Sequence, residues 1–94
     1  IQAAKRAPDL IPLCHPLLVG AVLLNFRIED TYIEVESHVD TVDRTGVEME
    51  ALTCVAVAAL ALIDMIKAVD RQARITDVRV VAKSGGRSGD WTAP

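Results

Sequence analysis

One apolar segment constrains this chain more than any other feature. Residues 51–63 contain thirteen amino acids without a charge, and as a helix they would be apolar around most of the circumference. Such a helix has to be covered on two sides. Apolar residues make up 51% of the sequence and aromatic residues only 3%, so the core is expected to be aliphatic. We predict that this helix packs on a sheet of its own chain and on a second copy of the chain.

Size, charge and cysteine content narrow the class of protein. The 94 residues predict one small domain, 1–94. The net charge of −3 gives no support to nucleic-acid binding. Thirteen uncharged residues are too short for a bilayer, so no membrane span is expected. Cys14 and Cys54 lack paired spacing, which favours a cytoplasmic, reduced protein. Because the sequence starts at Ile1 in a helical pattern, we expect it to be part of a longer chain.

The segments before the apolar run predict a helix, an extended stretch and a hairpin. Residues 1–6 have helical composition, and Pro8 is expected to end that helix. The prolines at 12 and 16 exclude helix and keep the backbone extended. Residues 19–29 and 32–42 alternate apolar and polar side chains, which predicts two antiparallel strands with one solvated face.

The second half predicts a long helix and a further strand. Thr45 is the expected N-cap, with Glu48 completing a capping box, and the helix should run from 46 to 69. Residues 75–83 read as a strand, followed by a glycine-rich loop. The order helix, strand, strand, helix, strand becomes a ferredoxin-like plait once one upstream strand is added. The predicted fold class is therefore α+β, an antiparallel sheet with helices on one face and the first strand missing from this chain.

Two sequence blocks offer side chains for chemistry. In Leu10-Ile-Pro-Leu-Cys-His-Pro-Leu17, the two prolines fix the direction of His15; the alternative is an ordinary packed histidine. No second Cys/His pair stands at zinc-finger spacing, so no metal is expected. In Thr45-Gly-Val-Glu-Met-Glu-Ala-Leu-Thr53, Glu48 is explained equally well as an acid that complements the helix dipole. Glu50 is harder to explain that way, because it borders the apolar run.

The end of the long helix and the loop after the last strand hold further charges. Asp64 and Lys67 lie at i, i+3 spacing on one helix face, which suits either a surface ion pair or general acid/base chemistry in a dry environment. Residues 67–90 contain six of the ten basic side chains against three acids. Lys83-Ser-Gly-Gly-Arg-Ser-Gly89 could form an anion cradle with Lys83 and Arg87 or a plain surface loop. It lacks the P-loop pattern.

Spacing along the long helix suggests that a site would be shared between chains. Glu50 and Asp64 are fourteen residues apart, which is ~21 Å at ~1.5 Å per residue. One small substrate cannot easily reach both within one chain. If two such helices packed antiparallel across a twofold axis, the glutamate end of one would meet the Asp64–Lys67 end of the other. We therefore hypothesise an active site shared at a dimer interface.

These blocks, together with Asp64-Met-Ile-Lys-Ala68, resemble the cyclic pyranopterin monophosphate synthases, the molybdenum cofactor biosynthesis protein C family. The four blocks occur in the same order and cover nearly the whole chain. The resemblance implies a lyase that converts 3′,8-cyclo-7,8-dihydro-GTP into cyclic pyranopterin monophosphate and releases pyrophosphate, the second step of molybdenum cofactor biosynthesis. It also implies a ferredoxin-like fold and a homohexamer, a trimer of dimers with active sites at the dimer interface.

The resemblance assigns roles to matching positions. Asp64 and Lys67 correspond to catalytic residues, and the substrate-binding positions are Leu13, Cys14, His15, Glu48, Met49, Glu50, Lys83 and Arg87. No cofactor or metal is implied, although magnesium could accompany the triphosphate. The family carries a further catalytic lysine upstream that nothing in this sequence matches, since Lys5 lies in another block. The competing hypotheses are a non-catalytic nucleotide-binding or partner-binding module and a purely structural self-associating domain.

Overall fold

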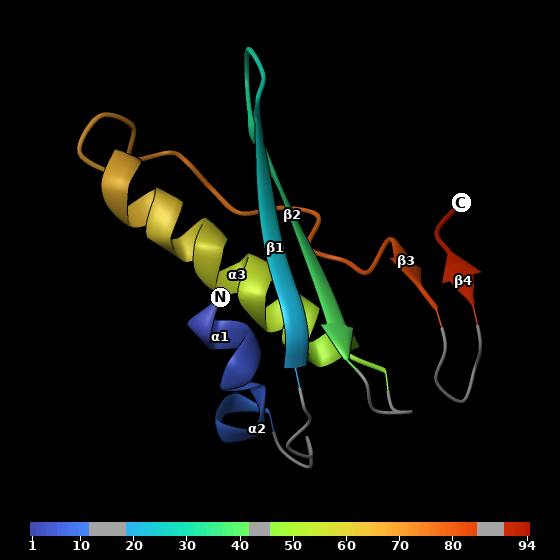
Figure 1. Ribbon diagram of the computed structural model, residues 1–94. Helices are drawn as coiled ribbons and strands as arrows, with labels where there is room; N and C mark the ends of the chain where they lie inside the picture. The colour runs from blue at the N-terminus through green and yellow to red at the C-terminus, as the bar shows by residue number, and fades with distance from the viewer. Residues whose placement is uncertain (12–18, 42–45, 85–89) are drawn as a thin grey trace.

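The computed structural model describes residues 1–11, 19–41, 46–84 and 90–94. Within them, helices and strands mix as an α+β arrangement, with both sheets antiparallel. Figure 1 shows the short N-terminal helices and the long helix beside the first hairpin. In chain order the elements are α1 (Gln2–Lys5), α2 (Ala7–Leu10), β1 (Val19–Ile28), β2 (Ile33–Thr41), α3 (Glu48–Ile66), β3 (Ala82–Lys83) and β4 (Trp91–Thr92). The arrangement is consistent with the predicted ferredoxin-like plait.

The hairpin β1–β2 confirms the alternating pattern. Phe26 pairs with Val35 and Arg27 with Glu34, and the register shifts between Val19 and Val22. The turn closes through a hydrogen bond from the Glu29 backbone N–H to the Tyr32 carbonyl at 2.9 Å. On the solvated face the Arg27 guanidinium contacts the carboxylates of Glu29 and Glu34 at 2.9 and 2.8 Å. Alternation at period two therefore predicted both the pairing and the wet face.

Helix α3 packs against the inner face of this hairpin, and the core lies between them. The buried residues of this core cluster are small or medium in size: Ala4, Val39 and Cys54. Around them pack the partly buried side chains Val22, Leu24, Val47 and Ala51. Figure 1 shows α1 lying beside the first half of α3. The aliphatic core is confirmed, and it gathers near the start of α3.

Part of the apolar surface of α3 stays uncovered in the single chain. Leu60 exposes 57% of its surface, and Val57 and Met65, which border the space between α3 and the hairpin, expose 42% and 70%. By length and composition alone the 19-residue helix could cross a membrane, which differs from the expectation drawn from the thirteen-residue run. A core helix of a soluble protein passes the same test, so the finding is weak. The uncovered surface leaves room for a second layer of apolar packing.

Helix ends differ from the expectations. Helix α3 begins at Glu48 with Val47 at the N-cap and no side-chain cap hydrogen bond from it, whereas the predicted cap, Thr45, lies outside the described residues. The Lys67 backbone N–H closes the other end on the Ile63 carbonyl. The first helix ends at Lys5, before Pro8 as expected, but a second helix begins at Ala7 with Pro8 in its first turn, where the missing N–H costs no hydrogen bond.

The strand expected over 75–83 is reduced to its last two residues. Ala82 and Lys83 pair with Thr92 and Trp91, while 73–81 carries no strand assignment. A strand needs hydrogen bonds to a neighbour, and the described residues supply that neighbour only at β4. Asp77 also has a φ of 60°, a left-handed conformation that interrupts an extended chain.

Candidate active site

The start of α3 and the short strand β3 bring two predicted site residues together. The Lys83 ammonium lies 3.0 Å from a carboxylate oxygen of Glu48, and the side chains are 17% and 29% exposed. These residues are far apart in sequence, so the contact is tertiary. The backbone N–H of Glu48, and then the hydrogen bond from Lys83, hold the pKa of Glu48 below its usual value, although partial burial opposes this. The carboxylate is thus kept ionised beside a largely covered cation.

Gly46 leaves space for that carboxylate. A Cβ atom at Gly46 would collide with one oxygen of the Glu48 carboxylate and would lie 2.6 Å from the other oxygen. The Glu48 side chain therefore folds back over the backbone that precedes α3. An acid at this position also complements the positive end of the helix dipole. The glycine before the helix is required by the way Glu48 reaches Lys83.

Glu50 is the most deeply buried acid in the described part of the chain. Only 2% of its surface is exposed, and its neighbours on the same helix face, Thr53 and Cys54, are also buried. Every fully buried side-chain nitrogen or oxygen among the described residues has a hydrogen-bond partner. Met49, between the two glutamates, is 39% exposed. In this helical turn the Glu50 side chain is buried, whereas the Glu48 side chain is 29% exposed.

A hydrogen bond from β2 fixes this end of the helix. The Ser37 hydroxyl donates to the Ala51 carbonyl at 2.7 Å in a partly buried contact. Ser37 sits at an inward position of β2, between Val35 and Val39, where the pattern would place an apolar residue. It ties the first turn of α3 to the hairpin, so both glutamates are carried on an anchored backbone.

Asp64 and Lys67 form the expected pair at the opposite end of α3. The Lys67 ammonium donates to the Asp64 carboxylate at 2.7 Å. The side chains of Asp64 and Lys67 are 73% and 64% exposed. The expected dry environment is therefore wrong for the single chain, because the end of α3 extends past its packing partners. What the sequence predicted correctly is the pairing on one helix face.

The two charged groups stay apart within one chain. Glu50 and Asp64 lie on the same uninterrupted helix, Glu48–Ile66, so their fourteen-residue spacing corresponds to ~21 Å. In the described part of one chain, Glu48 therefore contacts Lys83 and Asp64 contacts Lys67, and these two ion pairs lie at opposite ends of α3.

Four predicted binding residues lie outside the described part of the chain: Leu13, Cys14, His15 and Arg87. Within the described ranges, no three His, Cys, Asp or Glu side chains are placed to hold a metal ion.

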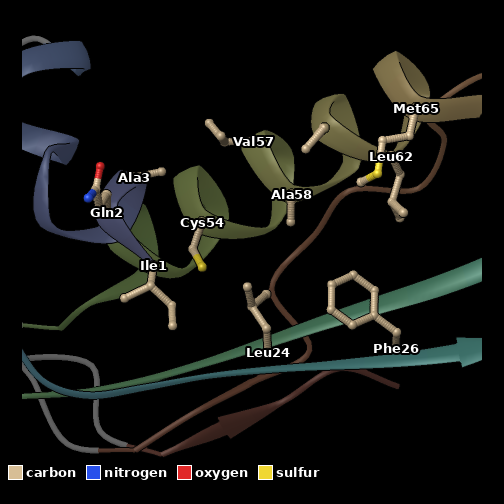
Figure 2. Close-up of a pocket in the computed structure, with 11 residues that line it drawn as sticks. Ile1, Gln2, Ala3, Leu24, Phe26, Cys54, Val57, Ala58, Leu62 and Met65 are labelled. Carbon is tan, nitrogen blue, oxygen red and sulfur yellow. The ribbon is translucent and has the colours of Figure 1, made fainter.

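An apolar groove lies between α3 and the hairpin, away from the charged pairs. Its volume is about 530 Å³. Figure 2 shows Leu24 and Phe26 of β1 facing Cys54, Ala58 and Leu62 of α3 across it. Among the lining residues only Gln2 has a polar side chain, which suits a nucleotide triphosphate poorly. We assign the groove to packing and place the candidate site at the two ends of the helix.

Sequence reasoning missed two features of the site. It placed Glu48 and Lys83 in one site without pairing them, because nothing in the spacing of distant residues shows a tertiary contact. It also passed over Ser37, although a polar residue in the inward register of an alternating strand is a usable signal.

Known proteins resemble the chain closely. A sequence model of the MoaC family matches residues 1–86. A Streptomyces coelicolor protein named cyclic pyranopterin monophosphate synthase is 63% identical over 92 residues, 98% of this chain and 54% of the relative. Proteins of the same name from Nocardioides sp. and Thermomicrobium roseum are 54% and 57% identical, over 100% and 97% of this chain and 60% and 56% of their own. The chain therefore spans a little over half the length of these relatives. Since the family model covers nearly all of it, the chain belongs to the MoaC family.

Proposed function

We propose that the protein to which this chain belongs is a lyase that converts 3′,8-cyclo-7,8-dihydro-GTP into cyclic pyranopterin monophosphate and releases pyrophosphate. The observation that carries the proposal is the family match over residues 1–86, together with relatives that bear the name of that synthase. The substrate is a small anionic molecule, and neither nucleic acid nor a membrane takes part. The expected location is the cytoplasm.

The site is shared between two copies of the chain. The ~21 Å between Glu50 and Asp64 exceeds what one small substrate can span. Met49 and Leu60 are exposed apolar side chains on α3 that do not line the groove toward the hairpin, and they provide a surface for a second helix. An antiparallel pair of α3 helices places the glutamate end of one copy against the Asp64–Lys67 end of the other. In the full assembly we expect a hexamer, a trimer of such dimers.

Asp64 and Lys67 serve as the acid and base. Opening the purine-derived ring and closing the pterin ring requires several proton transfers, and a carboxylate and an ammonium joined at 2.7 Å can exchange a proton. Both are exposed in the single chain, so a partner copy would have to exclude water from them.

The remaining residues bind and orient the substrate. Lys83 and Arg87 face the phosphates and stabilise the charge that grows on the departing pyrophosphate. The guanine-like edge forms a hydrogen bond with His15 and donates its N–H groups to the carboxylate of Glu48 or Glu50. Leu13, Cys14 and Met49 complete the pocket. No protein-bound cofactor or metal is required, and magnesium could arrive with the triphosphate.

Pyrophosphate release from 3′,8-cyclo-7,8-dihydro-GTP tests the proposal, with the cyclic monophosphate detected by mass. The assay compares this chain with a chimera in which the chain replaces the matching part of the Streptomyces coelicolor relative, and with that relative unaltered. Product from the chimera is the expected result. An assembled but inactive chimera beside an active control would overturn the lyase and favour a non-catalytic binding module.

A further inference from the structure

The cation that should receive a phosphate already has an anion beside it. The Glu48 carboxylate lies 3.0 Å from the Lys83 ammonium, in a place where only 17% of the Lys83 side chain is exposed. A largely covered ammonium is costly without a counter-charge. The pair therefore gives Lys83 a counter-charge and holds it in place when no ligand is bound.

The Glu48 carboxylate also occupies the position that favours any anion. It sits at the N-terminus of α3, where the helix dipole is positive. Its own backbone N–H and Lys83 both stabilise its charged form, which lowers its pKa. A phosphate oxygen approaching Lys83 would meet the same groups, so it has to displace the carboxylate or share the cation with it.

The Glu48 side chain can leave without moving the helix. It is 29% exposed, and the preceding Gly46 has no side chain to hold it. The hydrogen bond from Ser37 to the Ala51 carbonyl keeps the backbone of the first turn fixed. Glu50 is only 2% exposed, so of the two glutamates Glu48 is the one with a route to solvent.

We propose that Glu48 is an internal competitor for the phosphate-binding cation Lys83, and that its return to Lys83 promotes release of pyrophosphate. This inference rests on the proposed function for the assignment of Lys83 to the phosphates and for the identity of the anion. A bound pyrophosphate pairs with Lys83 while Glu48 turns outward. When the product loosens, the carboxylate recaptures the ammonium and the site closes against rebinding.

Isothermal titration with inorganic pyrophosphate tests the competition without requiring turnover. It uses the same chimera with the Streptomyces coelicolor relative and compares it with Glu48→Gln. Removing a competing charge should tighten pyrophosphate binding by about tenfold, which corresponds to ~1.4 kcal/mol. In Glu48→Gln combined with Lys83→Met the gain should vanish. The matched control is Glu34→Gln, which removes an equal charge from the ion pair with Arg27 on the hairpin and should leave the affinity unchanged.

Unchanged or weaker binding in Glu48→Gln would overturn the proposal, as would equal tightening in Glu34→Gln. If Glu48→Gln fails to fold by circular dichroism, Gly46→Ala replaces it, because the added methyl group pushes the carboxylate off Lys83 and keeps the net charge. That variant should also bind pyrophosphate more tightly. An inactive chimera whose Glu48→Gln variant still gains affinity would refute the lyase and leave the competition standing.

Discussion

The two ends of α3 carry similar pairs of charges in opposite surroundings. At the first end, Glu48 meets a lysine from a distant strand, and both side chains are mostly covered. At the other end, Asp64 meets Lys67 from the C-terminal turn of the same helix, and both are mostly exposed. Tertiary structure builds the first pair, whereas helical periodicity alone builds the second.

This difference shows which part of the site a single chain can prepare. Ser37, Gly46 and β3 hold the backbone of the first end in a defined geometry, so a ligand can bind there with a movement of the Glu48 side chain alone. The Asp64–Lys67 end has the correct chemistry but no enclosure, and an exposed ion pair contributes little. In the proposed dimer, the prepared end of one copy supplies the missing surroundings for the exposed end of the other.

Removing the exposed pair should have the largest effect on the reaction. Asp64→Asn and Lys67→Ala should each lower turnover by at least ~100-fold, because general acid/base groups commonly contribute ~10²–10⁴. Pyrophosphate release by the chimera measures this. Asp70→Asn is the matched control, since Asp70 lies just beyond the helix and accepts a hydrogen bond from the Gln72 backbone N–H. Near-normal rates with intact assembly would remove the altered residue from the mechanism.

Mixing two inactive variants tests whether the two ends come from different copies. Glu50→Gln and Asp64→Asn chimeras, unfolded together and refolded, should recover about a quarter of wild-type activity, because half of the randomly formed dimers have one intact shared site. Size-exclusion chromatography controls for assembly. An inactive mixture of well-assembled proteins would mean that each site uses one chain only.

Loosening the prepared end should cost stability. Ser37→Ala removes the hydrogen bond to the Ala51 carbonyl, which is expected to lower the free energy of unfolding by ~1 kcal/mol. In a domain of this size the melting temperature should fall by ~4–8 °C. Thermal unfolding followed by circular dichroism gives the value. Ser37→Thr keeps the hydroxyl and should recover most of the loss; if it does not, packing rather than the hydrogen bond explains the effect.

The smallest effect concerns pH and the Glu48–Lys83 pair. Because the pKa of Glu48 is lowered from 4.5, the stability that its charged form contributes is fully present above that value and is lost as the pH falls through the lower folded-state pKa. Wild type should be more stable than Glu48→Gln at pH 7, by ~0.2–1 kcal/mol for a partly exposed pair. Thermal unfolding across the pH range measures the difference, which should vanish in acid. A difference that does not shrink as the pH falls progressively below 4.5 would mean that the charge of Glu48 is not its source.

The sequence predicted the elements whose patterns are local. Alternation from Val22 to Ile28 and from Ile33 to Val39 specified the hairpin, and the uncharged run specified α3. It also placed Asp64 and Lys67 on one helix face, since that depends only on helix geometry. Glu50, which the helix dipole explained less well than Glu48, proves to be buried in the structure.

Features that depend on contacts between residues far apart in the sequence could not be predicted from local patterns. The apolar pattern of 75–83 indicates a strand, but pairing requires a neighbour, and the described residues provide one only for Ala82 and Lys83. The exposure of Asp64 depends on where the hairpin stops supporting α3. The contact between Glu48 and Lys83 depends on how β3 returns to the start of the helix. A single sequence carries no direct signal for any of these.

Because Cys54 is buried, the rate at which its thiol is labelled measures how often α3 separates from the hairpin. The residue is only 1% exposed, wedged where the helix meets the hairpin. An alkylating reagent can reach its thiol only in moments when the helix lifts away. Peptide mass analysis separates its modification from that of Cys14, so the labelling rate reports how often this joint opens. A second chain bound along the helix should lower the labelling rate of Cys54.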